Sequence, residues 1–210
     1  MMANKSRAWV LGLLFVIATP LWAAGIDEGI EYKTVSPRVD NQIDDKKVEV
    51  VELFWYGCPH CFHFEPLLDQ WIKNKPRNVN FVRIPAVFNP SWRLHAQAFY
   101  TAKVLGVLDK IHQPLFDAIH IKGQRMASAD ELADFFARHG VKKKAFFDAF
   151  NSFAVDADVR RAEDLTQRYG IDGVPSLIVD GKYRTSASLA GSNEKMLEVV
   201  NYLIAKEQGK

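Results

Sequence analysis

Residues 58–61 read Cys-Pro-His-Cys, and they hold both cysteines of this 210-residue chain. The segment before them, 48–55, is rich in β-branched and aromatic residues, which is typical of a strand buried on both faces of a sheet. In the segment after them, 62–72, apolar residues recur at helical spacing. We therefore predict that the two cysteines lie where a buried strand passes into a helix.

This setting favours a reactive thiol at Cys58. Cys58 is expected near the N-cap of the helix and Pro59 in its first turn, where the missing N–H costs no hydrogen bond. The free backbone N–H groups and the positive end of the helix dipole favour the Cys58 thiolate, and a protonated His60 adds to this effect. Because such a thiolate is a good leaving group, a disulfide between Cys58 and Cys61 is predicted to oxidise other thiols readily.

A lone C-x-x-C pair also occurs as half of a zinc site or as a structural disulfide. Zinc usually requires four protein ligands, and the chain has no second C-x-x-C pair. His60 and His63 are close enough in sequence to complete a site with the cysteines, so a protein that binds zinc or carries copper is one alternative. The proline inside the motif and the strand-to-helix setting favour redox chemistry, for which we expect no metal, nucleotide or flavin cofactor. Four histidines show no ligand spacing with one another and are predicted to be surface or packing residues: His63, His95, His112 and His120.

The N-terminus predicts export. Basic residues precede an apolar run over residues 8–18, and small residues follow at Ala23 and Ala24. The run is too short to span a bilayer comfortably, so we predict that residues 1–24 are a signal peptide, cleaved after Ala23 or Ala24. The mature protein would then lie outside the cytoplasm, where disulfides persist.

The composition permits one domain, alone or with an insertion. Hydrophobic residues make up 48% of the chain, which is enough for a sizeable core. The formal net charge of +2 is too small to indicate binding to nucleic acid or to an acidic surface. Composition alone therefore indicates a globular protein and leaves its function open.

A second strand is predicted over residues 78–85, where apolar and polar residues alternate. Together with the first strand and the helix it would form a βαβ unit. Residues 90–156 show no convincing strand. Five of their phenylalanines recur at helical spacing, which predicts core packing rather than a ligand site: Phe135, Phe136, Phe146, Phe147 and Phe150. We interpret this region as a helical insertion, with helices predicted over residues 91–105, 109–120, 128–139 and 142–150.

The last part of the chain, 157–210, returns to mixed helix and strand. Asp180 and Gly181 form a strong hairpin signal between two short strands. Pro175 at the start of the first of these strands cannot donate a ladder hydrogen bond, so it belongs at an edge, a first position or a special turn. The mature chain is thus divided into a first α/β part, 25–89, the helical insertion and a second α/β part. Within the second part, we predict a helix over residues 158–169, the hairpin over 177–185 and a final helix over 192–207.

Residues 58–61, the distant segment Gly173-Val174-Pro175 and the helical block between two α/β parts resemble the DsbA family of the thioredoxin superfamily. Proteins of this family are bacterial thiol:disulfide oxidants. The resemblance covers nearly the whole mature chain. It implies an α/β fold class, namely a thioredoxin fold with an inserted helical domain, and location in the periplasm.

The resemblance also implies roles for individual residues. Cys58 would be the solvent-facing nucleophile that forms a mixed disulfide with the substrate, and Cys61 the buried resolving cysteine. Val174 and Pro175 would be joined by a cis peptide bond and would face the disulfide, where their backbone pairs with an extended substrate strand. The implied activity is donation of the Cys58–Cys61 disulfide, by a monomer, to exported polypeptides with free thiols. A quinone-linked inner-membrane oxidant similar to DsbB would restore the disulfide.

An isomerase or a reductase would use the same cysteine pair and is the nearest alternative. Isomerases of this superfamily resemble dimers with a separate dimerisation domain, for which the chain has no room. Cytoplasmic reductases of the superfamily typically resemble Cys-Gly-Pro-Cys rather than Cys-Pro-His-Cys.

Glu52 stands in the predicted buried strand, where a carboxylate is costly unless it has a partner or a function. The resemblance places a buried acid at this position, beneath the active site, and a basic partner at Arg83. We expect Glu52 to relay protons to or from Cys61. Pro59 and His60 are expected to modulate the reactivity of the pair.

Overall fold

The computed structural model describes residues 25–40 and 47–209. The signal peptide predicted over residues 1–24 lies outside the described residues. Across the two described ranges, no helix has both the length and the apolar content needed to cross a bilayer. The elements in chain order are β1 (Lys33–Thr34), β2 (Val48–Phe54), α1 (Pro59–Asn74), β3 (Val79–Pro85), α2 (Pro90–Val104), α3 (Leu108–His120), α4 (Ala129–Arg138), α5 (Lys143–Phe150), α6 (Phe153–Arg168), β4 (Ser176–Val179), β5 (Tyr183–Ser186), α7 (Ala187–Ala190) and α8 (Asn193–Glu207).

The strands form one mixed sheet in the order β1-β5-β4-β2-β3. β2 and β3 are parallel, and their register places Glu52 opposite Arg83. The pairs β2–β4, β4–β5 and β1–β5 are antiparallel. The parallel β2–α1–β3 unit confirms the predicted βαβ arrangement. All residues of β2 except Glu49 are buried, as predicted for a strand covered on both faces.

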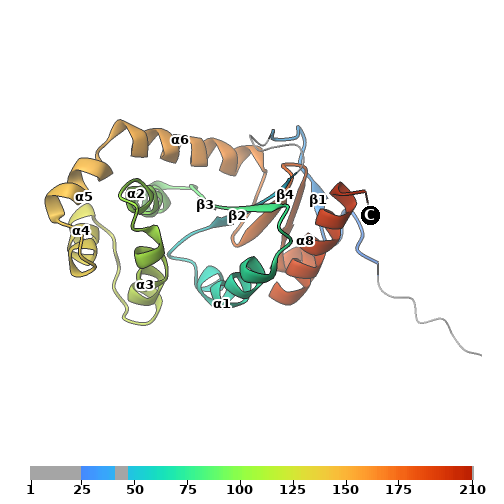
Figure 1. The fold of residues 1–210 in the computed structure, drawn as a ribbon, viewed down its shortest axis with the longest axis horizontal. Coiled ribbons are helices and arrows are strands. Elements are labelled where there is room, and N and C mark those ends of the chain that lie inside the picture. The colour runs from blue at the N-terminus through green and yellow to red at the C-terminus, as the bar shows by residue number, and fades with distance from the viewer. Residues whose placement is uncertain (1–24, 41–46, 210) are drawn as a thin grey trace, which may run out of the picture.

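Helices cover both faces of this sheet (Figure 1). Successive residues of a strand point to opposite faces, so neighbouring residues such as Val50 and Val51 of β2 belong to different apolar clusters. One cluster joins the sheet to α1 and α8, and the other joins it to α6 and the insertion. The first contains Leu177, Phe64, Leu68, Met196 and Val200, and the second contains Ile178, Ala162 and Leu165.

The helical insertion lies at one end of the molecule, to the left of the sheet in Figure 1. Its helices α2, α3, α4 and α5 begin and end within one residue of the predicted limits. The aromatic residues predicted as core are buried there, except that Phe147 is partly buried against the same cluster. The buried ones are Phe135, Phe136, Phe146 and Phe150. The fold is thus a thioredoxin-like fold with a helical insertion.

Helix α6 returns from the insertion to the sheet along one side of the molecule (Figure 1) and is longer than predicted. It begins at Phe153 rather than at residue 158. The reason is a helix cap, because the Ser152 hydroxyl accepts a hydrogen bond of 3.2 Å from the N–H of Val155. The helix therefore runs through residue 156, where the sequence places the end of the insertion.

β4 and β5 form the predicted hairpin. Its turn residues Asp180 and Gly181 have positive φ angles of 53° and 63°, as a type I′ turn requires. A Cβ atom on Gly181 would lie 1.8 Å from the carbonyl oxygen of Val39, so glycine is needed there for space as well. Two further features of the fold are not predicted by the sequence. They are the short helix α7 and a cis peptide bond between Ser36 and Pro37.

Candidate active site

The two cysteines lie at the N-terminus of α1, as predicted. Cys58 is the N-cap residue, with extended backbone angles of φ −89° and ψ 116°, and Pro59 begins the helix. The N–H of Cys61 donates to the Cys58 sulfur over 3.5 Å, which satisfies one of the free N–H groups of the first turn. Both cysteines are free in this structure.

The two sulfurs have opposite acidities. The pKa of Cys58 is lowered to about 6, first by the hydrogen bond from the Cys61 thiol and then by the backbone N–H groups of Cys61 and His60, which outweigh burial. Burial raises the pKa of Cys61 well above its usual value, and the neighbouring Cys58 and Glu52 raise it further. At neutral pH the reduced form therefore holds a thiolate at Cys58 and a thiol at Cys61.

The loop before β4 brings Val174 and Pro175 against the cysteine pair. The peptide bond between them is cis, as the resemblance implies. The carbonyl oxygen of Val174 lies 3.4 Å from the Cys58 sulfur and can accept a hydrogen bond from it only when Cys58 is protonated. Because of this cover, only 7% of Cys58 is exposed, compared with 0% of Cys61. Cys58 is therefore mostly covered rather than solvent-facing, although it is the more accessible of the two.

A hollow of about 370 Å³ opens beside the same loop. Since Val174 both lines the hollow and contacts the Cys58 sulfur, the hollow lies next to the reacting atom. Most of its lining comes from the loop and from the region around α7. The lining residues are His60, Asp172, Gly173, Val174, Pro175, Ser186, Ala187, Ser188 and Asn193.

Glu52 is fully buried in β2 and pairs with Arg83 of the neighbouring strand, as expected. Nε of Arg83 donates to Oε2 of Glu52 over 3.1 Å. Burial, and after it the negative charge of Glu65, raise the pKa of Glu52 to about 8 against the opposing effect of Arg83. A carboxyl group with this pKa can hold and release a proton near neutral pH.

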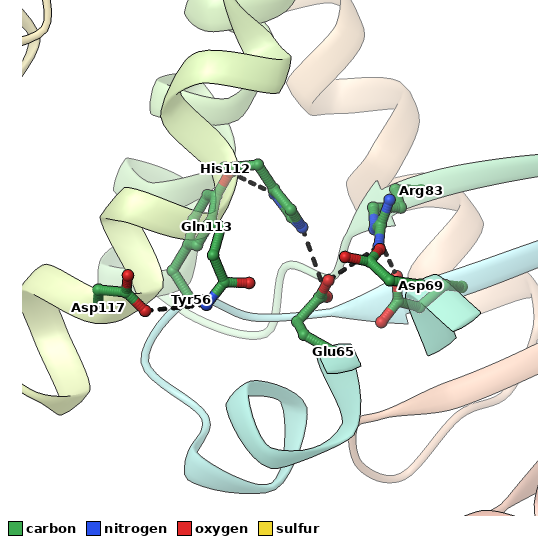
Figure 2. Close-up of polar contacts among 8 residues, drawn as sticks. Tyr56, Glu65, Asp69, Arg83, His112, Gln113 and Asp117 are labelled. Atoms are coloured by element: carbon green, nitrogen blue, oxygen red, sulfur yellow. Dashed lines mark hydrogen bonds and ion pairs between the residues drawn. The ribbon is translucent and has the colours of Figure 1, made fainter. Parts of the chain in front are cut away.

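Three more residues complete this cluster, namely Glu65 and Asp69 of α1 and His112 of α3 (Figure 2). The sequence predicts no role in the site for Glu65 or Asp69. It predicts His112 as a surface or packing residue, and the structure shows a buried residue that also contacts Glu65. Nη2 of Arg83 donates to Glu65 over 2.8 Å and to Asp69 over 3.1 Å. Nε2 of His112 lies 3.4 Å from Oε1 of Glu65. Burial raises the pKa of Glu65, but its contacts with His112 and then with Arg83 hold the pKa below its usual value.

One of these residues has a signal in the sequence. Glu65 follows Cys61 by about one helical turn, so both side chains lie on the same, buried face of α1. This spacing from a cysteine that is predicted to be buried is a signal in the sequence that Glu65 belongs to the site. His112 has no such signal, because a single histidine among apolar residues is usual in a packed helix.

The remaining histidines are not gathered into a ligand site. His60 and His63 are exposed on α1. His95 is buried against the carbonyl oxygen of Met126, and His120 contacts the carbonyl oxygen of Tyr56. Among the residues that the structure describes, no three or more His, Cys, Asp or Glu side chains are placed to hold a metal ion.

Comparison with known proteins gives a consistent result. The family described as the DSBA-like thioredoxin domain matches residues 81–200. A thiol:disulfide interchange protein DsbA from Pseudomonas syringae pv. tomato is 42% identical over 203 residues, which cover 97% of this chain and 94% of the relative. The crystal structure of Pseudomonas aeruginosa DsbA matches with a TM-score of 0.83 and 42% identity, over 88% of this chain and 95% of that one.

A more distant structure contains a peptide. It is a complex of Proteus mirabilis DsbA with a non-covalently bound peptide, PWATCDS, and it matches with a TM-score of 0.72 and 28% identity. The match covers 89% of this chain and 100% of that chain. The fold, the cysteine pair at the start of α1 and the full-length relatives lead to one conclusion: the chain belongs to the DsbA family of thiol:disulfide oxidoreductases.

Proposed function

We propose that this chain is a periplasmic dithiol oxidase, which donates a disulfide between Cys58 and Cys61 to exported polypeptides that carry free thiols. The observation that carries the proposal is the difference in acidity between the two sulfurs at the start of α1. A thiolate that is stabilised at Cys58 favours the reduced form of the protein. The corresponding disulfide is therefore a strong oxidant and needs no added cofactor.

In the first step, a substrate thiolate attacks the Cys58 sulfur of the oxidised protein. A substrate–Cys58 bond forms, the Cys58–Cys61 bond breaks, and its electron pair leaves on Cys61. Because burial destabilises a thiolate at Cys61, this sulfur takes up a proton. We assign the proton donor to Glu52, whose Oε1 is buried and makes no hydrogen bond within the described part of the chain.

In the second step, another substrate thiolate attacks the substrate sulfur of the mixed disulfide. The substrate disulfide forms, and Cys58 leaves as a thiolate, which needs no proton at neutral pH. Over both steps, two electrons pass from the substrate to the protein. Pro59 and His60 support the leaving group, because they shape and charge the helix N-terminus around Cys58.

We assign substrate binding to Val174 and Pro175 and to the hollow beside them. The backbone of this loop lies against the Cys58 sulfur, where it can pair with an extended peptide that presents its cysteine to the protein. The peptide complex of the Proteus mirabilis relative supports this assignment, since that protein binds a short peptide with a cysteine in its sequence.

Each turnover consumes the disulfide, so an external oxidant must restore it. We propose that a quinone-linked inner-membrane protein similar to DsbB accepts the two electrons. Export by the signal peptide predicted over residues 1–24 would bring the protein to the compartment where this partner and the unfolded substrates meet.

The direction of transfer can be tested with purified mature protein. The oxidised protein is mixed in equal amounts with a reduced peptide that carries two cysteines, and mass spectrometry follows both molecules after alkylation of free thiols. We expect the peptide to become disulfide-bonded while Cys58 and Cys61 become reactive towards the alkylating agent. The Cys58→Ser variant should be inactive, and a chelator should have no effect.

Two results would overturn the proposal. If the reduced protein instead reduces a peptide disulfide almost completely at the same stoichiometry, the chain is a reductase. If the chelator abolishes the reaction, the cysteines act through a metal.

A further inference from the structure

A single guanidinium, that of Arg83, faces two buried carboxyl groups. It donates through Nε to Glu52 and through Nη2 to Glu65, over 3.1 and 2.8 Å. A third acid, Asp69, is half exposed and can remain charged in contact with water. In a buried site, the one charge of Arg83 cannot compensate two carboxylates, so one of the two buried groups holds a proton when the imidazole of His112, which contacts Glu65, is neutral. The surrounding contacts decide which one.

His112 from the helical insertion distinguishes the two carboxyl groups. Its Nδ1 lies 2.9 Å from the hydroxyl of Tyr56, and its Nε2 lies 3.4 Å from Oε1 of Glu65 (Figure 2). Tyr56 is fully buried and keeps its proton, because burial raises its pKa well above the usual value. When the Tyr56 hydroxyl donates to Nδ1, the imidazole proton lies on Nε2 and points at Glu65. The opposite arrangement would place a nitrogen lone pair against a carboxylate.

The contacts of the two acids are therefore unequal. Glu65 has Arg83 on one oxygen and His112 on the other. Oε1 of Glu65 and Nε2 of His112 are both buried and make no other polar contact in the described part of the chain. Glu52 has Arg83 on one oxygen only, and its second oxygen has no hydrogen bond there. The negative charge is thus better stabilised on Glu65.

We propose that His112, held in place by Tyr56, is a positioning residue that keeps Glu65 ionised and thereby places the shared proton on Glu52. This inference rests on the role proposed above for Glu52 as proton donor to Cys61. It makes the helical insertion part of the proton supply of the active site, although α3 does not carry either cysteine.

The charged and titratable groups around Glu52 are few. Arg83 approaches it from β3, and Tyr56 lies just beyond the end of its own strand. From α1 it interacts with Cys61, Glu65 and Asp69. β4 and α8 present apolar side chains to this face of the sheet. His112 acts on Glu52 through Glu65.

The test reads the two carboxyl groups individually. Reduced mature protein is labelled with ¹³C at the glutamate side-chain carboxyls, and its pH titration is followed by NMR. The Glu52→Gln and Glu65→Gln variants assign the two buried signals. In the His112→Leu variant, we expect the proton affinity of Glu52 to fall about tenfold or more and that of Glu65 to rise. His112→Gln keeps an N–H donor towards Glu65 and should restore much of the difference.

Two further variants complete the design. His63→Leu removes an exposed histidine of α1 and should change neither titration. Tyr56→Phe removes only the hydroxyl that orients His112, and it should shift both affinities in the same direction as His112→Leu. The proposal is wrong if Glu52 in a folded His112→Leu variant titrates as in the unmodified protein. If His112→Leu does not fold, an unchanged Glu52 titration in Tyr56→Phe overturns the proposal in the same way.

Failure of this proposal is distinguishable from failure of the proton-relay role. The relay is tested by the pH dependence of disulfide exchange in Glu52→Gln. An unchanged pH dependence there would remove the relay, while a shifted Glu52 titration in His112→Leu would still establish His112 as the residue that places the proton.

Discussion

The hydroxyl of Tyr56 and Nδ1 of His112 lie 2.9 Å apart, and this hydrogen bond joins helix α3 of the insertion to the loop that precedes Cys58. The same tyrosine is also contacted at its carbonyl oxygen, which lies 2.8 Å from Nε2 of His120. Both histidines belong to α3. The insertion thus contacts the loop before Cys58 through both the side chain and the main chain of Tyr56. These two contacts fix the position of the loop beside the cysteines.

Loss of the Tyr56 hydroxyl should therefore destabilise the protein. In Tyr56→Phe, the buried Nδ1 of His112 loses its partner, and we expect the free energy of unfolding to fall by about 1–3 kcal/mol. Denaturant unfolding of the reduced protein measures this. Tyr202→Phe is a matched control, because Tyr202 is 41% exposed, and its effect should stay within about 0.5 kcal/mol. Equal stabilities of the two variants would contradict the role of Tyr56.

The lowered pKa of Cys58 predicts how the stability of the reduced form changes with pH. Its pKa in the folded protein is about 6, below the ordinary value of 9.0. The thiolate therefore stabilises the folded protein fully above pH 9.0, and this contribution is lost as the pH falls through about 6. Relative to Cys58→Ser, the free energy of unfolding of the reduced protein should rise between these two pH values. Thiolate absorbance should titrate with a midpoint near pH 6, and a midpoint near 9.0 would refute the assignment.

The raised pKa of Glu52 predicts the opposite pH dependence of stability. Its pKa in the folded protein is raised to about 8 from 4.5, so the folded protein holds a proton that the unfolded chain releases in this window. The associated stability is fully present below pH 4.5 and is lost as the pH rises through about 8. The unmodified protein should therefore lose stability across this window relative to Glu52→Gln. Unfolding curves at several pH values measure the difference, which should be absent if Glu52 is ionised throughout.

The ring of Trp55 leaves no space for a side chain at position 57, so glycine is required there. A Cβ atom at Gly57 would lie 2.3 Å from the Trp55 ring, which stacks on Trp92 with centroids 4.4 Å apart. Gly57→Ala should displace Trp55, lower the free energy of unfolding by about 1–3 kcal/mol and change the tryptophan fluorescence. Gly173→Ala serves as the control for these two readouts, since a Cβ there meets nothing within 4 Å. Unchanged fluorescence in Gly57→Ala would contradict this packing.

The features that the sequence predicts well depend on residues close together in the chain. Local backbone preferences predict the start of α1, with Cys58 as N-cap and Pro59 as the first helical residue. They also predict the turn at Asp180 and Gly181. The limits of α2 to α5 follow from apolar periodicity over two or more turns. Helix α7 contains only four residues, which is too few for such a pattern.

The parts of the site that the sequence does not predict depend on contacts between distant elements. Glu65 of α1 and His112 of α3 are such residues, and only the folded chain brings them together with each other and with Arg83 of β3. The cover over Cys58 likewise comes from the carbonyl group of Val174, more than a hundred residues further along the chain. A single sequence gives no information about these distances, so it does not predict the contacts of Glu65 and His112 or the cover over Cys58.

The equilibrium between the mature protein and glutathione redox buffers tests the central claim most directly. Trp55, three residues before Cys58, is expected to report the state of the pair by its fluorescence, and alkylation of free thiols checks that signal. If a thiolate at the start of α1 stabilises the reduced form, the pair should remain reduced until the buffer is quite oxidising, and the reduced protein should be the more stable form. A pair that is already oxidised in strongly reducing buffer would contradict the account and would indicate a reductase or a structural disulfide.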